Sequence, residues 1–324
     1  MGWRDTPLAQ RLGLRLPVIQ APMAGGASTP RLVATVSGAG GLGSIAGAML
    51  SPDDLRAAIR EVRTLTAMPF AVNLFAPLPP PSSDRVAEWT RLTGVEAAAR
   101  PPGPRFDDQL AVVVEEQVAV FSFTFGIPPI GDLDTFTMGT ATTVAEAVAL
   151  ESAGADAVVA QGYEAGGHRG TFLEPVDHSL VGTIALVPQV VDAVDIPVIA
   201  SGGIMDGRGI AAALALGAQA VQLGTAFLQS AEAGTADPHR EAVGRETTIT
   251  RALTGRHARV VRTPLVDRLE QSGLEPPDYP LPRFLSPEPP WLVGQGGPLA
   301  RALPAADLLA ALEAETHAAL ARLV

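Results

Sequence analysis

The sequence predicts an α/β fold, a parallel TIM-type (β/α)8 barrel, and three observations lead to it. Eight short apolar runs lie within the first 225 residues, and none shows the clean alternation of a strand with one solvent face. Segments with helical spacing of apolar residues lie between most of these runs. Strands that alternate with helices form a parallel sheet, and eight such units close into a barrel. An open doubly wound sheet is the alternative.

Each predicted element has its own signal. The strands are expected at 17–23, 41–47, 70–75, 118–126, 135–142, 157–162, 197–203 and 220–225. The helix at 51–65 opens with a Ser-Pro pair and an acidic first turn, while those at 142–154 and 205–218 end at glycine or just before it. An amphipathic helix at 305–323 returns to the barrel wall.

The link between the fourth and fifth strands breaks the pattern. Only IPPIGDLD, residues 127–134, separates them. A crossover with its helix needs at least about 10–12 residues. The fourth helix is therefore predicted to be missing or reduced to one turn.

Two regions fall outside the alternation of strands and helices. Residues 76–108 are a proline-rich insertion, with a short helix expected near 84–98. Residues 228–295 contain a second proline-rich stretch and are expected to cover one mouth of the barrel. We therefore predict a ligand-binding barrel at 1–227, a small substrate or lid domain at 228–294 and a C-terminal helix at 295–324 that returns to the barrel.

Composition excludes several kinds of chemistry. The 324-residue chain has no cysteine, and all of its basic residues are arginine. Thiolate chemistry, lysine Schiff bases and the lysine-containing phosphate loop are therefore impossible. The net charge of −11 offers no basic face for nucleic acid. No apolar run approaches the roughly 20 residues of a membrane span, and the start lacks a signal core, so a cytoplasmic protein is expected.

Glycines follow the last two predicted strands. IASGGI and LGTAF place Gly202, Gly203 and Gly224 beside the hydroxyls of Ser201 and Thr225. In a barrel the loops after strands seven and eight are neighbours and form the usual phosphate site. The alternative is two tight turns without a ligand.

Polar side chains end two other strands. Asn73, the only asparagine, and Gln161 could each offer an amide to a flat heterocycle. Asn73 could equally be a turn residue. Gly166 and Gly167 would make room for a flat ligand, and His168 would then point across it. His168 could otherwise be an ordinary loop histidine. The other four histidines have no such context and no metal-ligand spacing, so no metal site is predicted.

These motifs resemble one family, the FMN-dependent nitronate monooxygenases, formerly called 2-nitropropane dioxygenases. The matching segments span nearly the whole chain: 20–47, 70–75, 121–126, 139–147, 154–172, 197–204 and 220–228, with TGRHARVVR and VGQG near the C-terminus. The motif that ends in GGHRGTF is the most specific of them. The chain departs from some family members in having only two tyrosines, Tyr163 and Tyr279, and no lysine.

The resemblance implies a cofactor site and a reaction. The FMN ring would lie over Ala21, Pro22 and Met23, with the amides of Asn73 and Gln161 at its polar edge. Its phosphate would sit on Gly202, Gly203, Gly224 and Thr225. His168 matches the family's active-site histidine. It would hold the nitro group or take a proton from a neutral nitroalkane, and either role suits a pKa near 6.5.

The implied reaction is oxidation of an alkyl nitronate with O2 to a carbonyl compound and nitrite, by a monomer or homodimer. A second interpretation is an NADH-dependent FMN reductase of an enoyl thioester or quinone, because a related enoyl-acyl-carrier-protein reductase carries a similar Gly-Gly-His. Arg169 and Thr171, after the histidine, favour the first. A flavin-binding protein with altered or lost activity is the third. Tyr163 is expected to face either the substrate or solvent.

Overall fold

Eight parallel strands form the barrel in the computed structural model, which describes residues 2–95 and 103–322. They are β1 (Val18–Gln20), β2 (Gly43–Ala46), β3 (Phe70–Phe75), β4 (Val120–Thr124), β5 (Phe136–Ala141), β6 (Ala157–Gln161), β8 (Val198–Ser201) and β9 (Ala220–Leu223). Their order in the sheet is β1-β9-β8-β6-β5-β4-β3-β2, and a parallel bridge between Ile19 and Leu42 closes it. Each strand lies within a predicted run, so the barrel prediction is confirmed.

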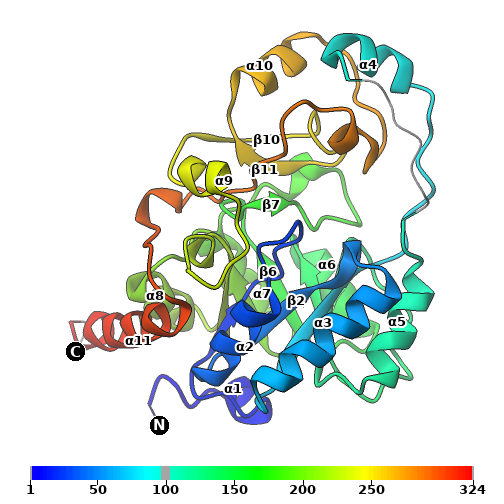
Figure 1. The fold of residues 1–324 in the computed structure, drawn as a ribbon. Helices are drawn as coiled ribbons and strands as arrows, with labels where there is room; N and C mark the ends of the chain where they lie inside the picture. The colour runs from blue at the N-terminus through cyan, green and yellow to red at the C-terminus, as the bar shows by residue number, and fades with distance from the viewer. Residues whose placement is uncertain (1, 96–102, 323–324) are drawn as a thin grey trace.

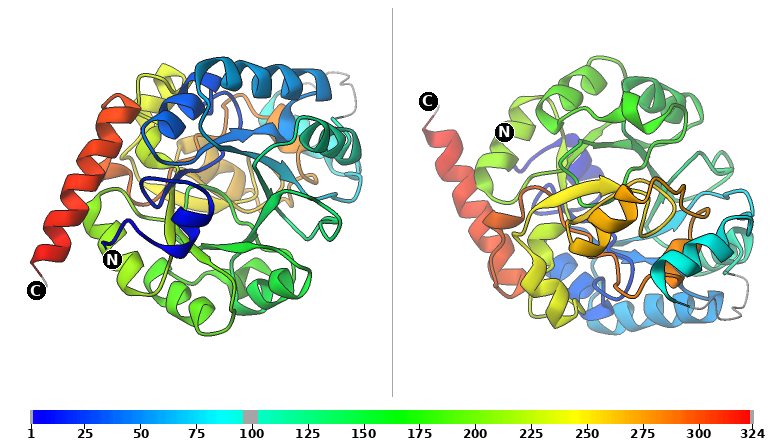
Figure 2. Two further views of the ribbon diagram at one scale, coloured as in Figure 1. Left: turned by 90° about the horizontal axis from the view of Figure 1, so that it is seen from below. Right: turned by 90° about the horizontal axis from the view of Figure 1, so that it is seen from above.

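Helices surround this sheet (Figures 1 and 2). Those of the barrel wall are α2 (Pro30–Gly38), α3 (Pro52–Leu65), α5 (Phe106–Glu115), α6 (Val144–Ser152), α7 (Thr183–Val191) and α8 (Gly207–Ala215). The last helix, α11 (Ala305–Ala321), packs against α8 and α2. Ser51 caps α3 by accepting a hydrogen bond from the Asp54 amide at 3.1 Å, which satisfies one of the free N–H groups of the first turn.

A short N-terminal helix, α1 (Pro7–Arg11), closes the lower end of the barrel. Figure 2 (left) shows it across the middle of that end. Its Leu8 is fully buried and belongs to one apolar cluster with Ile19, Ala71 and Val159 from the strands. The lower end is therefore packed, and the open end is the one where the strands have their carboxyl termini.

The connection between β4 and β5 contains no helix among residues 125–135, all of which the structure describes. The predicted loss of the fourth helix is confirmed. The predicted insertion at 76–108 was too long, because the barrel helix α5 begins at Phe106 inside it. Helix α4 (Val86–Thr93) lies within the short helix expected near 84–98, of which residues 96–98 fall outside the described residues.

A cover lies over the open end of the barrel (Figure 1). Its centre is a small antiparallel sheet of β7 (Gly167–His168), β11 (Ala258–Val261) and β10 (Thr247–Thr250), which the sequence did not predict. The helices of the cover are α9 (Asp237–Ala242) and α10 (Pro264–Gln271). Trp89 of α4 shares an apolar cluster with Val260 and Leu265, so the insertion also contributes to the cover. Short 3-10 turns occur at Gly47–Met49, Val176–Ser179, Thr225–Phe227, Leu281–Phe284 and Gly297–Leu299.

No helix in the described part of the chain is both long and apolar enough to cross a membrane.

Candidate active site between the barrel and its cover

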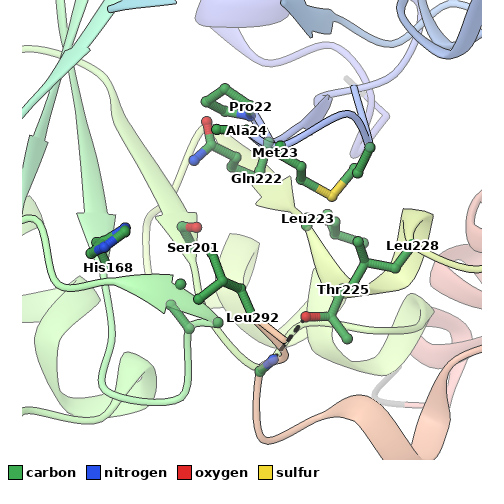
Figure 3. A pocket seen from close by; sticks show the side chains of 18 of the residues that line it. Pro22, Met23, Ala24, His168, Ser201, Gln222, Leu223, Thr225, Leu228 and Leu292 are labelled. Atoms are coloured by element: carbon green, nitrogen blue, oxygen red, sulfur yellow. Dashed lines mark hydrogen bonds between the residues drawn. The ribbon is translucent and has the colours of Figure 1, made fainter. Parts of the chain in front are cut away.

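A cavity of about 300 Å³ lies where the strand ends meet the cover (Figure 3). That volume is at the lower end of the range of small-molecule sites. The thirteen residues predicted to be catalytic or to bind the cofactor all line it: Ala21, Pro22, Met23, Asn73, Gln161, Gly166, Gly167, His168, Ser201, Gly202, Gly203, Gly224 and Thr225. Figure 3 shows His168 on one side and Thr225 on the opposite side, with Ser201 between them. The parallel barrel brings these distant segments together.

The charge of the cavity wall is opposite to that of the chain. Among the described residues, its lining contains no aspartate and no glutamate, although the chain carries 34 acidic residues and a net charge of −11. The ionisable side chains of the lining are Arg283, His168 and His239. A wall with arginine and without carboxylates favours an anionic ligand.

The backbone of His168 is fixed from two sides. As part of β7, it is paired with Ala258 of β11 in the cover sheet. From the barrel side, Gln161 Nε2 donates to the His168 carbonyl at 3.0 Å, and the Gly170 amide donates to Gln161 Oε1 at 2.8 Å. Gln161 therefore braces the histidine loop with both ends of its amide, a role that the sequence did not indicate.

The imidazole of His168 lies between two aromatic rings. The ring centroids of Tyr279 and Phe125 lie 5.3 and 5.8 Å away, both edge to face. Burial, together with the positive charges of Arg256 and Arg283, lowers the pKa of His168 to about 3. The expected pKa near 6.5 is therefore wrong, and the imidazole is neutral. Its buried Nε2 has no hydrogen-bond partner among the residues described.

Two buried ionic side chains hold the loop that carries His168. Arg169 is 1% exposed and donates from Nη1 to the Gly162 carbonyl at 2.7 Å and from Nη2 to the Ser179 carbonyl at 2.8 Å. Glu146 is fully buried and accepts from the amides of Phe172 at 2.6 Å and Leu173 at 3.1 Å. Unpaired backbone groups are costly when buried, so these bonds keep the loop in one conformation.

The two glycines before His168 line the cavity and also shape the backbone of the loop. A Cβ on Gly166 would lie 2.5 Å from the Gly294 amide nitrogen, so this glycine makes room for backbone of the cover. Gly167 has φ +81°, a conformation that favours glycine. Together they let the loop turn beneath the Leu292–Gly294 segment.

The glycines after β8 and β9 provide donors. In the described part of the chain, no hydrogen bond uses the backbone N–H groups of Gly203, Gly224 or Thr225. The Gly294 amide donates to Thr225 Oγ1 at 2.9 Å, which leaves the hydroxyl proton available (Figure 3). Gly202 and Gly203 have φ of +119° and +72°, which the turn requires. Such a set of free donors at one end of a cavity suits the phosphate of a mononucleotide.

Asn73 and Tyr163 end in different surroundings. Asn73 is 4% exposed and donates from Nδ2 to Ser122 Oγ at 3.0 Å, so it belongs to a polar pair in the cavity wall. Tyr163 lies outside the lining, with the Arg259 guanidinium 4.4 Å from the centre of its ring. It is therefore a packing residue of the cover.

Sequence reasoning missed four residues near His168: Phe125, Arg256, Tyr279 and Arg283. Three of them come from the cover, whose position over the barrel no local pattern reveals. TGRHARVVR, which includes Arg256, was noted only as a family segment. The described residues also contain no group of three or more acidic, histidine or cysteine side chains that could hold a metal ion.

Known proteins resemble the chain over most of its length. The nitronate monooxygenase family model matches residues 7–314. A probable nitronate monooxygenase of Staphylococcus saprophyticus is 42% identical over 309 residues, covering 87% of this chain and 85% of that protein. One of Staphylococcus aureus is 40% identical over 310 residues, with coverages of 88% and 86%.

Two solved structures resemble this fold. Nitroalkane oxidase from Streptomyces ansochromogenes superposes with a TM-score of 0.89 at 40% identity, covering 98% of this chain and 100% of that one. FabK from Thermotoga maritima superposes with a TM-score of 0.76 at 33% identity, covering 98% of both chains. The chain therefore belongs to the nitronate monooxygenase family and is an oxidoreductase.

Proposed function

We propose that the chain is an FMN-dependent enzyme that oxidises alkyl nitronates with O2 to a carbonyl compound and nitrite. The observation that carries the proposal is the cavity wall, which has an arginine, a buried neutral histidine and free backbone donors but no carboxylate. Both the cofactor phosphate and a nitronate are anions. The net charge of the chain is −11, but among its described residues the cavity wall has no negative side chain that would repel either anion.

The residues present fit FMN at two points. The free N–H groups of Gly203, Gly224 and Thr225 would hold the phosphate, with the hydroxyl of Ser201 beside them. The ring would lie over the Ala21–Met23 segment. FMN, when bound, supplies the oxidation-reduction chemistry that the side chains of this chain lack. The protein supplies binding, orientation and charge.

His168 would act as a hydrogen-bond donor. Its buried Nε2 has no partner among the described residues, so a nitronate oxygen would satisfy it. A pKa of about 3 makes the imidazole a weak base at neutral pH, which disfavours proton abstraction from a neutral nitroalkane. Arg283 adds a positive charge to the same wall. We therefore propose that the nitronate anion, formed beforehand in solution, is the substrate.

The second candidate is an NADH-dependent FMN reductase of an enoyl thioester or quinone. It is favoured by the likeness to FabK, at 33% identity and a TM-score of 0.76. The likeness to nitroalkane oxidase is greater in both respects. The two candidates differ in the compound that reduces the flavin, which is the nitronate in the first and NADH in the second.

The test is the visible spectrum of the purified protein after anaerobic addition of one donor at a time. Loss of flavin absorbance with propionate 3-nitronate, followed by nitrite release in air, is the expected result. Loss of absorbance with NADH alone would replace the proposal with the reductase. His168→Gln should keep the flavin and lose most turnover, while His178→Gln, at an exposed position, should retain both. A colourless protein that FMN does not reconstitute would refute the cofactor.

A further inference from the structure

Phe125 is a strained residue in the cavity wall. The chain bends directly after β4, with φ of +79° at Phe125 and +154° at Gly126. Among described non-glycine residues, only Gln117 shares a positive φ. A bulky side chain rarely adopts this conformation, because Cβ clashes with backbone. Strain of this kind persists where surrounding contacts impose it, often at functional sites.

The ring of Phe125 is the centre of an aromatic group beside His168. It is 4% exposed and lines the cavity. Its centroid lies 4.5 Å from that of Phe75, 5.8 Å from that of His168 and 6.0 Å from that of Tyr279. The rings of Phe75 and Phe125 therefore form an apolar part of the cavity wall beside His168, and Tyr279 supports them from outside the lining.

Arg256 holds this ring from another side. Its Cζ lies 4.0 Å from the Phe125 centroid, which is a close cation–π contact. Its Nη2 donates to the Thr171 carbonyl, three residues after His168. Arg256 is absent from the cavity lining, so it acts through Phe125 and the histidine loop. The cation–π contact therefore favours one position of the ring at the cavity wall.

We propose that Phe125, held by Arg256, sets the chain length of the nitronate that the enzyme accepts. This inference rests on the proposed function. With the anionic end of the substrate at His168, its alkyl chain meets the rings of Phe75 and Phe125, which line the cavity. Because the Phe125 ring is fixed, a longer chain is excluded by the wall. Phe125 is then a specificity-determining residue, and Arg256 is a positioning residue.

The experiment compares kcat/KM for linear nitronates from nitroethane to nitrohexane. One methylene in a hydrophobic pocket changes kcat/KM by about tenfold or more. Phe125→Leu should therefore raise the ratio of nitrohexane nitronate to nitroethane nitronate at least about tenfold, and Phe125→Trp should lower it. Phe123→Leu removes the same volume from a buried position outside the cavity and should leave the ratio unchanged.

Arg256→Gln should shift the same ratio in the direction of Phe125→Leu, while Arg251→Gln, which alters an outer arginine of the same segment, should not. An unchanged ratio in Phe125→Leu or Arg256→Gln, with turnover retained, overturns the assignment of that residue.

A binding experiment tests the role of Phe125 without requiring turnover. It measures by calorimetry the affinity for linear carboxylates from acetate to hexanoate. If the wild-type protein turns over no nitronate, the proposed function fails, and binding still tests Phe125. The ratio of the Kd for acetate to the Kd for hexanoate should be at least about tenfold higher in Phe125→Leu than in the wild-type protein. Equal ratios, or no binding of any carboxylate by either protein, overturn the inference.

Discussion

Acidification should destabilise the protein through His168. Burial lowers the pKa of this imidazole from 6.5 to about 3 in the folded chain, whereas the unfolded chain keeps the ordinary value. The folded state therefore binds fewer protons. The contribution of His168 to stability is fully present above pH 6.5 and is lost as the pH falls from 6.5 toward about 3.

The size of the effect follows from the two pKa values. At pH 5.0 an imidazole with the unfolded pKa is about 97% protonated, and one with the folded pKa is about 1% protonated. Linkage converts this difference into about 2 kcal/mol of unfolding free energy lost between pH 7.5 and pH 5.0. That is a large share of the roughly 5–15 kcal/mol by which proteins are stable.

Urea denaturation at pH 7.5 and 5.0 measures this loss, with His168→Gln as the perturbation. The wild-type protein should lose about 2 kcal/mol more than the variant between the two pH values. His239 and His257, whose pKa values burial also lowers, contribute to both proteins equally and cancel. His178→Gln should behave like the wild type. Equal losses in wild type and His168→Gln would refute the buried, neutral histidine on which the proposed mechanism depends.

Two substitutions test the framework of the site. Glu146→Gln replaces a buried carboxylate that accepts four hydrogen bonds, so it should lower the unfolding free energy by about 2–3 kcal/mol in thermal denaturation, with exposed Glu241→Gln unchanged. Gly203→Ala forces φ +72° on an alanine whose Cβ would lie 3.1 Å from the Glu164 Cβ. It should weaken FMN binding at least about tenfold in a fluorescence titration, while Gly103→Ala, at a position with free space, should bind as before.

Local sequence patterns were enough to predict the barrel and the residues at its open end. A buried parallel strand appears in the sequence as a short apolar run. The C-terminal ends of all such strands lie at the open end of the barrel, so the residues that end each run lie there too. Ser201, Asn73 and Gln161 could therefore be placed at one cavity from their positions along the chain. Helix α5 was not predicted, because the prolines directly before Phe106 make its first residues resemble the end of the proline-rich insertion.

The cover could not be predicted in the same way. Strand β7 has two residues and pairs with β11, about 90 positions later, so no local alternation marks either as a strand. Arg256 and Tyr279 reach His168 only through this pairing and the fold of the proline-rich segment. The pKa of His168 follows from burial beneath these residues, which the sequence of the histidine loop does not contain.

The arginines of the cover and the neutrality of His168 are connected. Arginine stays protonated at any physiological pH, so Arg256 and Arg283 supply a positive charge that does not vary. Their charge and the burial of the ring keep His168 neutral. The protonation state of its imidazole is therefore also constant at physiological pH. An enzyme that deprotonated neutral nitroalkanes would need the opposite arrangement, with a carboxylate near the imidazole to raise its pKa. The wall of this cavity has none among its described residues, so its charge pattern suits capture of an anion that already exists.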